Sequence, residues 1–156
     1  MKLAQTITQE SLNDLLVQAR NSPRRRTPHN FHPHHDHPCH RLLNGLCPDT
    51  YIRPHCHLDP NKDETMIVLK GTIGVLFFDT NGAVTNTFLL KAGGEQLGLT
   101  IPVGQFHSLV ALEDAVFLES KAGPYLALSE PETAPWAPAE QDSDAANYRE
   151  RLKSYF

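Results

Sequence analysis

The central half of the sequence restricts the chain to a β fold. From about Arg41 to Ser120, short runs rich in Val, Ile, Leu, Phe and Thr alternate with Gly, Pro, Asn and Asp, which is typical of strands joined by tight turns. Asn81 and Gly82 lie between two such runs and favour a hairpin turn, because both residues tolerate positive φ. The runs predict strands near 41–46, 50–57, 64–70, 72–79, 84–90, 96–101, 105–111 and 115–120. Short strands without intervening helices indicate a β-sandwich or a jelly-roll barrel.

Helices are expected at both ends of this β region. Leu12, Leu15, Leu16 and Ala19 are spaced as one face of a helix over residues 8–20, with Thr8 as its N-cap. A shorter helix is predicted near the C-terminus, capped by Asp144. Between the first helix and the β region, residues 23–40 hold three arginines, four prolines and six histidines. This composition predicts an irregular segment.

The chain has the length of one domain, because 156 residues are too few for two full-sized cores. We divide it into an N-terminal helix with a His/Pro-rich segment (1–40), a β-barrel (41–122) and a Pro-rich tail with a C-terminal helix (123–156). The net charge of −4 argues against a nucleic-acid binder that relies on phosphate neutralisation. No apolar run approaches the roughly 20 residues that cross a bilayer, and no signal-peptide core follows Met1. We therefore expect a cytoplasmic protein without a membrane partner.

Three histidines and a glutamate have spacings that suit a metal site. His55 and His57 are two residues apart on a predicted strand, so their side chains point to the same face. Glu64 begins the next predicted strand, and His107 lies on a third. Imidazole and carboxylate donors suit a divalent transition metal such as zinc, iron, manganese or nickel, and leave positions open for water or substrate. The spacing predicts one metal ion held by these histidines, with Glu64 as the fourth ligand.

Tyr51 and Arg53 precede the histidine pair at the same two-residue spacing, so on a strand they would point to the same face as His55 and His57. Tyr51 and Arg53 are expected to face the barrel interior with His55 and His57, where the Arg53 guanidinium would bind a carboxylate or phosphate of a substrate. The alternative is that the strand twists and Arg53 reaches solvent. The six histidines of residues 29–40 also allow two interpretations. They form either a second metal site or a mostly solvated loop, and we favour the loop.

The metal-site residues resemble the two motifs of the cupin superfamily, G-x5-HxH-x3to4-E-x6-G and G-x5-PxG-x2-H-x3-N. The matching positions, in order, are His55, His57, Glu64, Gly71, Pro102, Gly104 and His107. The chain differs at Asp49 and Gln96, which replace two glycines, at Ala111, which replaces the final Asn, and in the six residues between His57 and Glu64. The resemblance implies a cupin jelly roll around a metal.

A fuller resemblance is to the WbuC family of cupin-fold metalloproteins, often encoded among genes for O-antigen polysaccharide synthesis. The similar stretches are 30–32, 41–44, 50–57, 101–112, 123–125 and 134–140. The first of them contains His32, which we expect to fold over the cavity mouth and contact the substrate. The resemblance implies a metal-binding jelly roll but no particular reaction.

Two classes of function fit these observations. The first is a metal-dependent enzyme that acts on a small polar, anionic and sugar-derived molecule, as an isomerase or epimerase or as a dioxygenase. The second is a non-catalytic module that senses a metal or a carbohydrate, because a jelly roll does not by itself fix a function. Catalytic residues are not assigned. Burial of hydrophobic side chains in the barrel and an exposed sheet edge favour a homodimer for either class of function.

Overall fold

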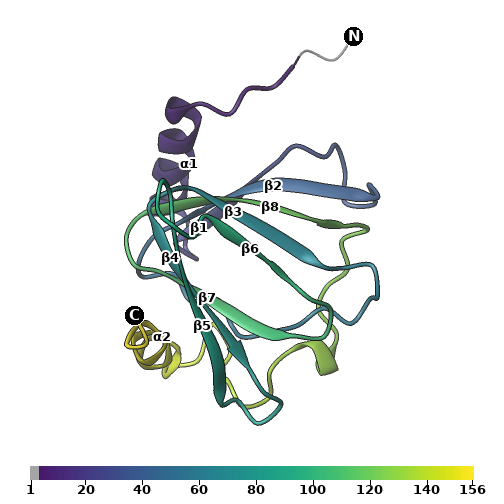
Figure 1. Cartoon of the computed structure of the whole chain (residues 1–156), viewed down its shortest axis with the longest axis vertical. Coiled ribbons are helices and arrows are strands. Elements are labelled where there is room, and N and C mark those ends of the chain that lie inside the picture. Colours follow the sequence, from purple (N-terminus) through teal and green to yellow (C-terminus); the bar gives the residue numbers. More distant parts are fainter. Residues whose placement is uncertain (1–3) are drawn as a thin grey trace.

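Two antiparallel β-sheets face each other in the computed structural model, which describes residues 4–156 (Figure 1). The larger sheet has the strand order β1-β2-β8-β3-β6, and the smaller has the order β5-β4-β7. The strands are β1 (Arg26–Asn30), β2 (Cys39–Leu46), β3 (Glu64–Lys70), β4 (Thr72–Phe78), β5 (Val84–Lys91), β6 (Gly98–Ile101), β7 (Phe106–Ala111) and β8 (Ala115–Ala122). The helices are α1 (Gln9–Asn21), the short 3-10 helix η1 (Glu130–Glu132) and α2 (Ala145–Lys153). The predicted all-β fold with a helix at each end is confirmed.

Apolar side chains from both sheets fill the space between them. On β4, Ile73 and Val75 belong to this core, whereas Leu76 and Phe78 pack in a different cluster outside the sheet. This is the alternation expected of a strand that is covered on both faces. The buried core residues are Leu46, Met66, Val68, Ile73, Val75, Phe77, Leu90, Ile101, Leu109, Ala111, Ala115 and Phe117.

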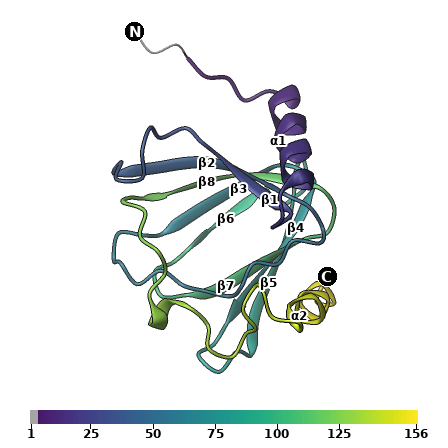
Figure 2. The ribbon, with the colours of Figure 1, turned by 180° about the vertical axis from the view of Figure 1, so that it is seen from behind.

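Helix α1 covers the outer face of the larger sheet. Thr8 is its N-cap as predicted, and the Thr8 hydroxyl accepts a hydrogen bond from the Ser11 backbone N–H at 3.1 Å. The apolar face of α1 packs against Leu43 of β2 and Val116 of β8. Figure 2 shows α1 lying against the larger sheet beside β1. Gly45 permits this close approach, since a Cβ atom there would lie 2.9 Å from Leu15 Cγ.

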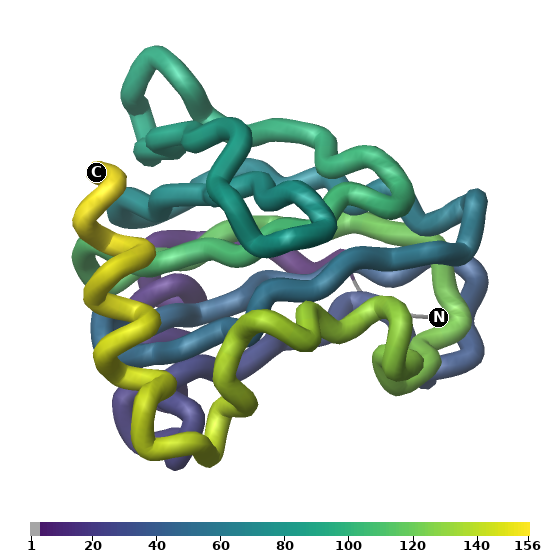
Figure 3. The backbone as a smooth tube through the Cα atoms, turned by 90° about the horizontal axis from the view of Figure 1, so that it is seen from below, coloured from purple at the N-terminus to yellow at the C-terminus, as the bar shows by residue number. Residues whose placement is uncertain are grey.

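Helix α2 covers the outer face of the smaller sheet. Tyr148 and Leu152 pack there with Leu76 and Val110. The tail after β8 crosses the molecule before it enters α2 (Figure 3). Asp144 occupies the predicted N-cap position, but its side chain makes no capping hydrogen bond. None of the described helices is long and apolar enough to span a membrane.

Two predicted segments differ from the structure. Residues 26–30, expected to be irregular, form β1 and pair with β2, so the larger sheet begins inside the segment 1–40. Pro28 is tolerated because β1 is the edge strand of its sheet. Conversely, residues 50–57 form no regular strand. They run in an extended path with isolated bridges from His55 to His107 and Thr133.

The turn between β4 and β5 lies where Asn81 and Gly82 predict a hairpin, but only one of these two residues has the expected positive φ. Only Gly82 has positive φ, at 88°. The Asp79 carboxylate accepts hydrogen bonds from the backbone N–H groups of Asn81 and Ala83, each at 2.9 Å. The side chain of Asp79 therefore organises this turn, and Asn81 needs no left-handed conformation.

Candidate metal centre

His55 is held in place by backbone pairing on both sides. Its N–H donates to the His107 carbonyl at 3.0 Å, and the His107 N–H donates back to the His55 carbonyl at 2.8 Å. On the other side, the Cys56 N–H donates to the Glu132 carbonyl at 2.9 Å. The segment that carries His55 and His57 is thus fixed between β7 and η1, at one end of the space between the sheets.

The three predicted histidines converge. His55, His57 and His107 each offer a ring nitrogen, and these three atoms lie within 4.8 Å of one another. The ring centroids of His55 and His107 are 4.5 Å apart, and those of His55 and His57 are 5.4 Å apart. His107 is buried on β7, and the other two rings are half-buried. Nitrogen atoms this close together can bind one ion.

Backbone carbonyls orient two of the rings. The Nδ1 atom of His55 lies 3.0 Å from the Arg53 carbonyl, and that of His107 lies 2.9 Å from the Gln105 carbonyl. Since a carbonyl only accepts, each Nδ1 carries the proton and each Nε2 keeps a free lone pair. Burial lowers the pKa of His55 to about 3 and also lowers the pKa of His107. Both imidazoles are therefore neutral near pH 7, the form that binds metals.

Glu64, the first residue of β3, lies at the edge of the histidine cluster. Its Oε2 atom is 3.2 Å from His57 Nε2 and 3.3 Å from Lys121 Nζ. Burial alone would raise the pKa of Glu64, but the Lys121 ammonium and the His57 contact outweigh it and hold that pKa below its usual value. Glu64 thus presents an ionised carboxylate beside the three imidazoles.

The sequence interpretation missed a buried charged network behind Glu64. Lys121 Nζ lies 2.6 Å from a carboxylate oxygen of Glu119, and Asn44 donates to the other Glu119 oxygen at 2.7 Å. These side chains line a cavity of about 100 Å³ that also reaches His107. Burial, then the nearby Glu64 carboxylate, raises the pKa of Glu119. The sequence held a signal for this network, because Glu119 and Lys121 lie two and four residues after Phe117 on β8. Alternation along the strand therefore places all three side chains on its inner face.

The side chains of Tyr51 and Arg53 donate hydrogen bonds to the tail after β8 and do not line the cavity over His55 and His57. The Tyr51 hydroxyl donates to the Pro138 carbonyl at 2.9 Å, and its ring packs edge-on against Tyr148. Arg53 donates to the Ala134 carbonyl at 2.7 Å and lines a separate cavity next to His55. Strand alternation does not apply to residues 50–54, because they are not paired as a strand.

His32 is buried in the β1–β2 loop and stacks on His40, with ring centroids 4.0 Å apart. His40 in turn lines a cavity that contains His55 and His57, whereas His32 itself does not line it. The other loop histidines are less enclosed, and His34 and His35 are exposed. Within residues 4–156, the group of metal-ligating side chains that converges is the one at His55, His57 and His107.

This arrangement makes a prediction for the loop. Replacing His34, His35 and His37 together by Ser should leave the metal content and the melting temperature nearly unchanged, because surface substitutions usually change stability by less than about 0.5 kcal/mol. Elemental analysis and thermal unfolding of the triple variant beside the parent protein test this. Loss of a whole equivalent of metal would reveal a site in the loop.

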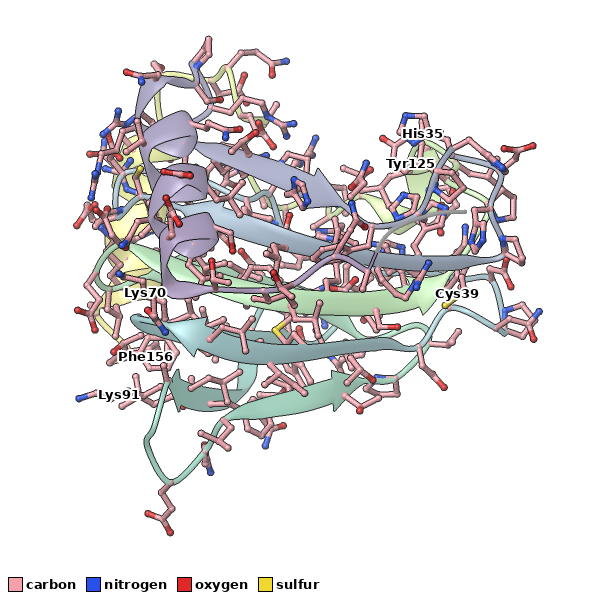
Figure 4. All side chains as sticks on the ribbon, turned by 90° about the horizontal axis from the view of Figure 1, so that it is seen from above. His35, Cys39, Lys70, Lys91, Tyr125 and Phe156 are labelled. Carbon is pink, nitrogen blue, oxygen red and sulfur yellow. The ribbon has the colours of Figure 1, made fainter. Side chains whose placement is uncertain are left out.

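A cavity of about 500 Å³ opens over His55 and His57. Segment 124–129 forms one wall, and the view of Figure 4 shows its Tyr125 beside His35 at the end of the molecule opposite Phe156. Lys62 also lines the cavity. It is 8% exposed and has no ion pair among the described residues. The sequence held no signal for Lys62, because its place depends on the turn after Asp59.

A family model described as "Domain of unknown function (DUF6016)" matches residues 7–90. Among solved structures, the conserved SPY1581 protein of unknown function from Streptococcus pyogenes is 13% identical over 81% of this chain and 93% of that chain, with a TM-score of 0.53. KdgF from Halomonas sp. is 18% identical over 67% of this chain and 84% of that chain, with a TM-score of 0.51. No curated protein matches the sequence.

A cupin-2 domain containing protein from Shewanella frigidimarina NCIMB 400 is also similar, with 23% identity over 62% of this chain and 80% of that chain and a TM-score of 0.47. Identities this low concern the fold alone. The fold class predicted from the sequence, an all-β jelly roll with a helix at each end, is confirmed by the two facing sheets and by the likeness to KdgF. The cluster of three histidines is a candidate metal site of that fold.

Proposed function

We propose a metal-dependent role for this chain, which belongs to the family of the domain of unknown function DUF6016. One divalent transition metal is held by His55, His57 and His107, with Glu64 as the fourth ligand. The observation that carries the proposal is the set of three imidazole nitrogens within 4.8 Å of one another. Zinc, iron, manganese and nickel all accept this donor set.

The donor chemistry fits a metal better than a structural cluster. Three buried or half-buried imidazoles have little reason to crowd together without an ion, because none of them donates a hydrogen bond to another. The carbonyl bonds at Nδ1 of His55 and His107 leave two Nε2 lone pairs free. The Glu64 carboxylate adds a negative charge that a cation would neutralise.

The proposed activity is that of an enzyme acting on a small polar, anionic substrate in the cavity over the histidines. A bound metal supplies Lewis-acid polarisation of a carbonyl or hydroxyl, or an activated water. Lys62 attracts a negatively charged substrate group to the same cavity. The cavity of about 500 Å³ has the size of a small-molecule site and suits a sugar-derived ligand.

The resemblance to the WbuC family adds finer proposals. A role in O-antigen or another polysaccharide synthesis, a cytoplasmic location and a homodimer all follow from that resemblance and the sequence argument. An isomerase or epimerase and a dioxygenase both fit the site. The competing proposal is a sensor that binds metal and carbohydrate without turnover.

Elemental analysis of protein purified without a His-tag or a nickel column tests the metal. We expect about one ion per chain, bound by protein ligands at the histidine cluster. Iron would favour oxygen chemistry, whereas zinc or manganese would favour isomerisation or binding. Less than a tenth of an equivalent of any transition metal, even after incubation with each ion and desalting, would remove the proposal.

Assays on the metal-loaded protein then separate the enzyme from the sensor. Oxygen consumption and turnover of nucleotide sugars should give a rate for an enzyme and only saturable binding for a sensor. The metal-free protein is the matched control, because both functions need the ion. A rate that persists without metal would contradict the proposed use of the site.

A further inference from the structure

We propose a second ligand site, separate from the histidine cluster, in which Arg24, Arg26 and Arg53 bind a phosphate-type dianion. The three side chains line one cavity of about 390 Å³ beside His55. It is a different cavity from the one over the metal cluster, although His55 and Leu128 line both. The proposal does not depend on a metal being bound.

Positive charge in this cavity exceeds negative charge. Among its lining residues the three arginines carry three positive charges, and Glu140 is the one carboxylate. Arg24 binds Glu140 through two hydrogen bonds, at 2.7 and 2.9 Å, and Arg26 binds the same carboxylate. Two guanidinium groups therefore share one negative charge, and Arg53 has no carboxylate partner among the described residues.

Arg53 keeps an unused donor. Its terminal NH2 group donates to the Ala134 carbonyl, but its Nε atom is buried and has no hydrogen-bond partner. Only one other buried side-chain nitrogen or oxygen among the described residues is unpaired, that of Trp136. An unpaired buried donor is costly, and Arg53 lines the cavity, so a rotation of its side chain that brings Nε to an oxyanion there would relieve that cost.

The chemistry favours phosphate over a carboxylate. A guanidinium group donates two parallel hydrogen bonds to neighbouring oxygens of an oxyanion. A carboxylate ligand would offer only two oxygens. The protein already provides such a group to Arg24 and Arg26, namely the Glu140 carboxylate. A tetrahedral dianion offers more oxygens and a second negative charge, so it can engage Arg53 while the other two arginines keep Glu140. The ligand is then inorganic phosphate or the phosphate of an ester.

Calorimetric titration of the metal-stripped full-length chain tests the site. The probes are inorganic phosphate and glucose 1-phosphate, used at low ionic strength because salt screens exposed charges. Both should bind. Tighter binding of glucose 1-phosphate identifies an ester as the ligand, and equal or weaker binding identifies the free ion. The metal-stripped protein excludes phosphate bound to a metal, so the result is independent of the proposed function.

Two substitutions, one that removes a positive charge and one that removes a negative charge from the cavity, make the test specific. Arg24→Gln should weaken phosphate binding by about three- to tenfold, the effect of losing one partly exposed charged donor. Glu140→Gln should tighten phosphate binding, because it frees two guanidinium groups from their internal partner. Arg41→Gln and Glu95→Gln change the charge equally at exposed positions outside the cavity and should leave binding unchanged.

Thermal unfolding covers the case in which Glu140→Gln lowers stability. Phosphate should then raise the melting temperature of that variant more than that of the parent protein, because a ligand that binds more tightly adds more stability at the same concentration. The proposal is overturned if Arg24→Gln and Arg41→Gln bind phosphate equally, or if Glu140→Gln weakens binding and gains no thermal stability from phosphate. Absence of binding to the metal-stripped parent protein would also overturn it.

Discussion

Replacing His57 by Ala should reduce the bound metal from about one ion per chain to close to zero, because the site then loses one of three imidazole ligands. Loss of only an outer hydrogen-bond partner typically costs 10- to 100-fold in metal affinity, so loss of a ligand should cost more than about 100-fold. The fold should survive, since the His57 side chain keeps 12% exposure and its hydrogen bond is to Glu64.

Elemental analysis and thermal unfolding with and without a chelator measure this effect. In the parent protein, metal at about 100 times its Kd adds roughly 2.7 kcal/mol of stability, which the chelator removes. His57→Ala should show no such difference. His29→Ala is the matched control, because His29 is an exposed histidine outside the cluster. Full metal content in His57→Ala would exclude His57 as a ligand.

The site was predictable where local rules apply to a regular strand. Glu64 begins β3 and shares its inward face with Met66 and Val68, as alternation requires. His107 shares the inward face of β7 with Leu109 in the same way. These short-range patterns, together with the histidine spacing, were sufficient to predict that the proposed metal ligands lie close together.

Prediction failed where distant segments decide the local conformation. The backbone around His55 is fixed by β7 and by Thr133, which lies 78 residues further along the chain. Tyr51 and Arg53 therefore follow contacts with the tail, at Pro138 and Ala134, instead of strand parity. No local pattern in residues 50–57 carries that information.

The edge strand β1 was missed for a related reason. Proline and asparagine are depleted in strands, and Pro28 cannot donate a ladder hydrogen bond. The pairing of His29 with Leu43 of β2 depends on the neighbouring strand and on α1, which packs over both β1 and β2. Local composition could predict that this segment is polar, but it could not predict that the segment would pair with β2 at the edge of the sheet.

Replacing Lys121 by Met should destabilise the metal-free protein at pH 7 by about 3–5 kcal/mol, the usual cost of removing one partner of a buried ion pair. Lys121 lies 2.6 Å from Glu119 and 3.3 Å from Glu64, and both carboxylates are buried. Burial and repulsion between the two carboxylates would then be the main influences on their pKa values. Their pKa values in the folded variant should rise above the value of about 4.3 for glutamate in an unfolded chain.

The sign of the pH dependence follows from those shifts. A carboxyl group whose pKa is raised in the folded state takes up protons there first, so acidification from pH 7 toward pH 5 stabilises the variant. In the parent protein, Glu64 has a lowered pKa, and its contribution to stability is present above pH 4.3 and lost below it. The pKa of Glu119 is already raised in the parent, which gives a weaker change of the same sign as in the variant. The difference in stability between parent and variant should therefore shrink between pH 7 and pH 5.

Urea unfolding at pH 7 and pH 5 in the presence of a chelator measures that difference. Lys91→Met is the matched control, because Lys91 is exposed on β5 at the end of the molecule away from Cys39 and Tyr125 (Figure 4). It should change stability little at either pH. Equal unfolding free energies for the two variants at pH 7 would show that Lys121 is not needed to neutralise Glu64 and Glu119. The Glu64 carboxylate would then be kept ionised by its contact with His57 alone.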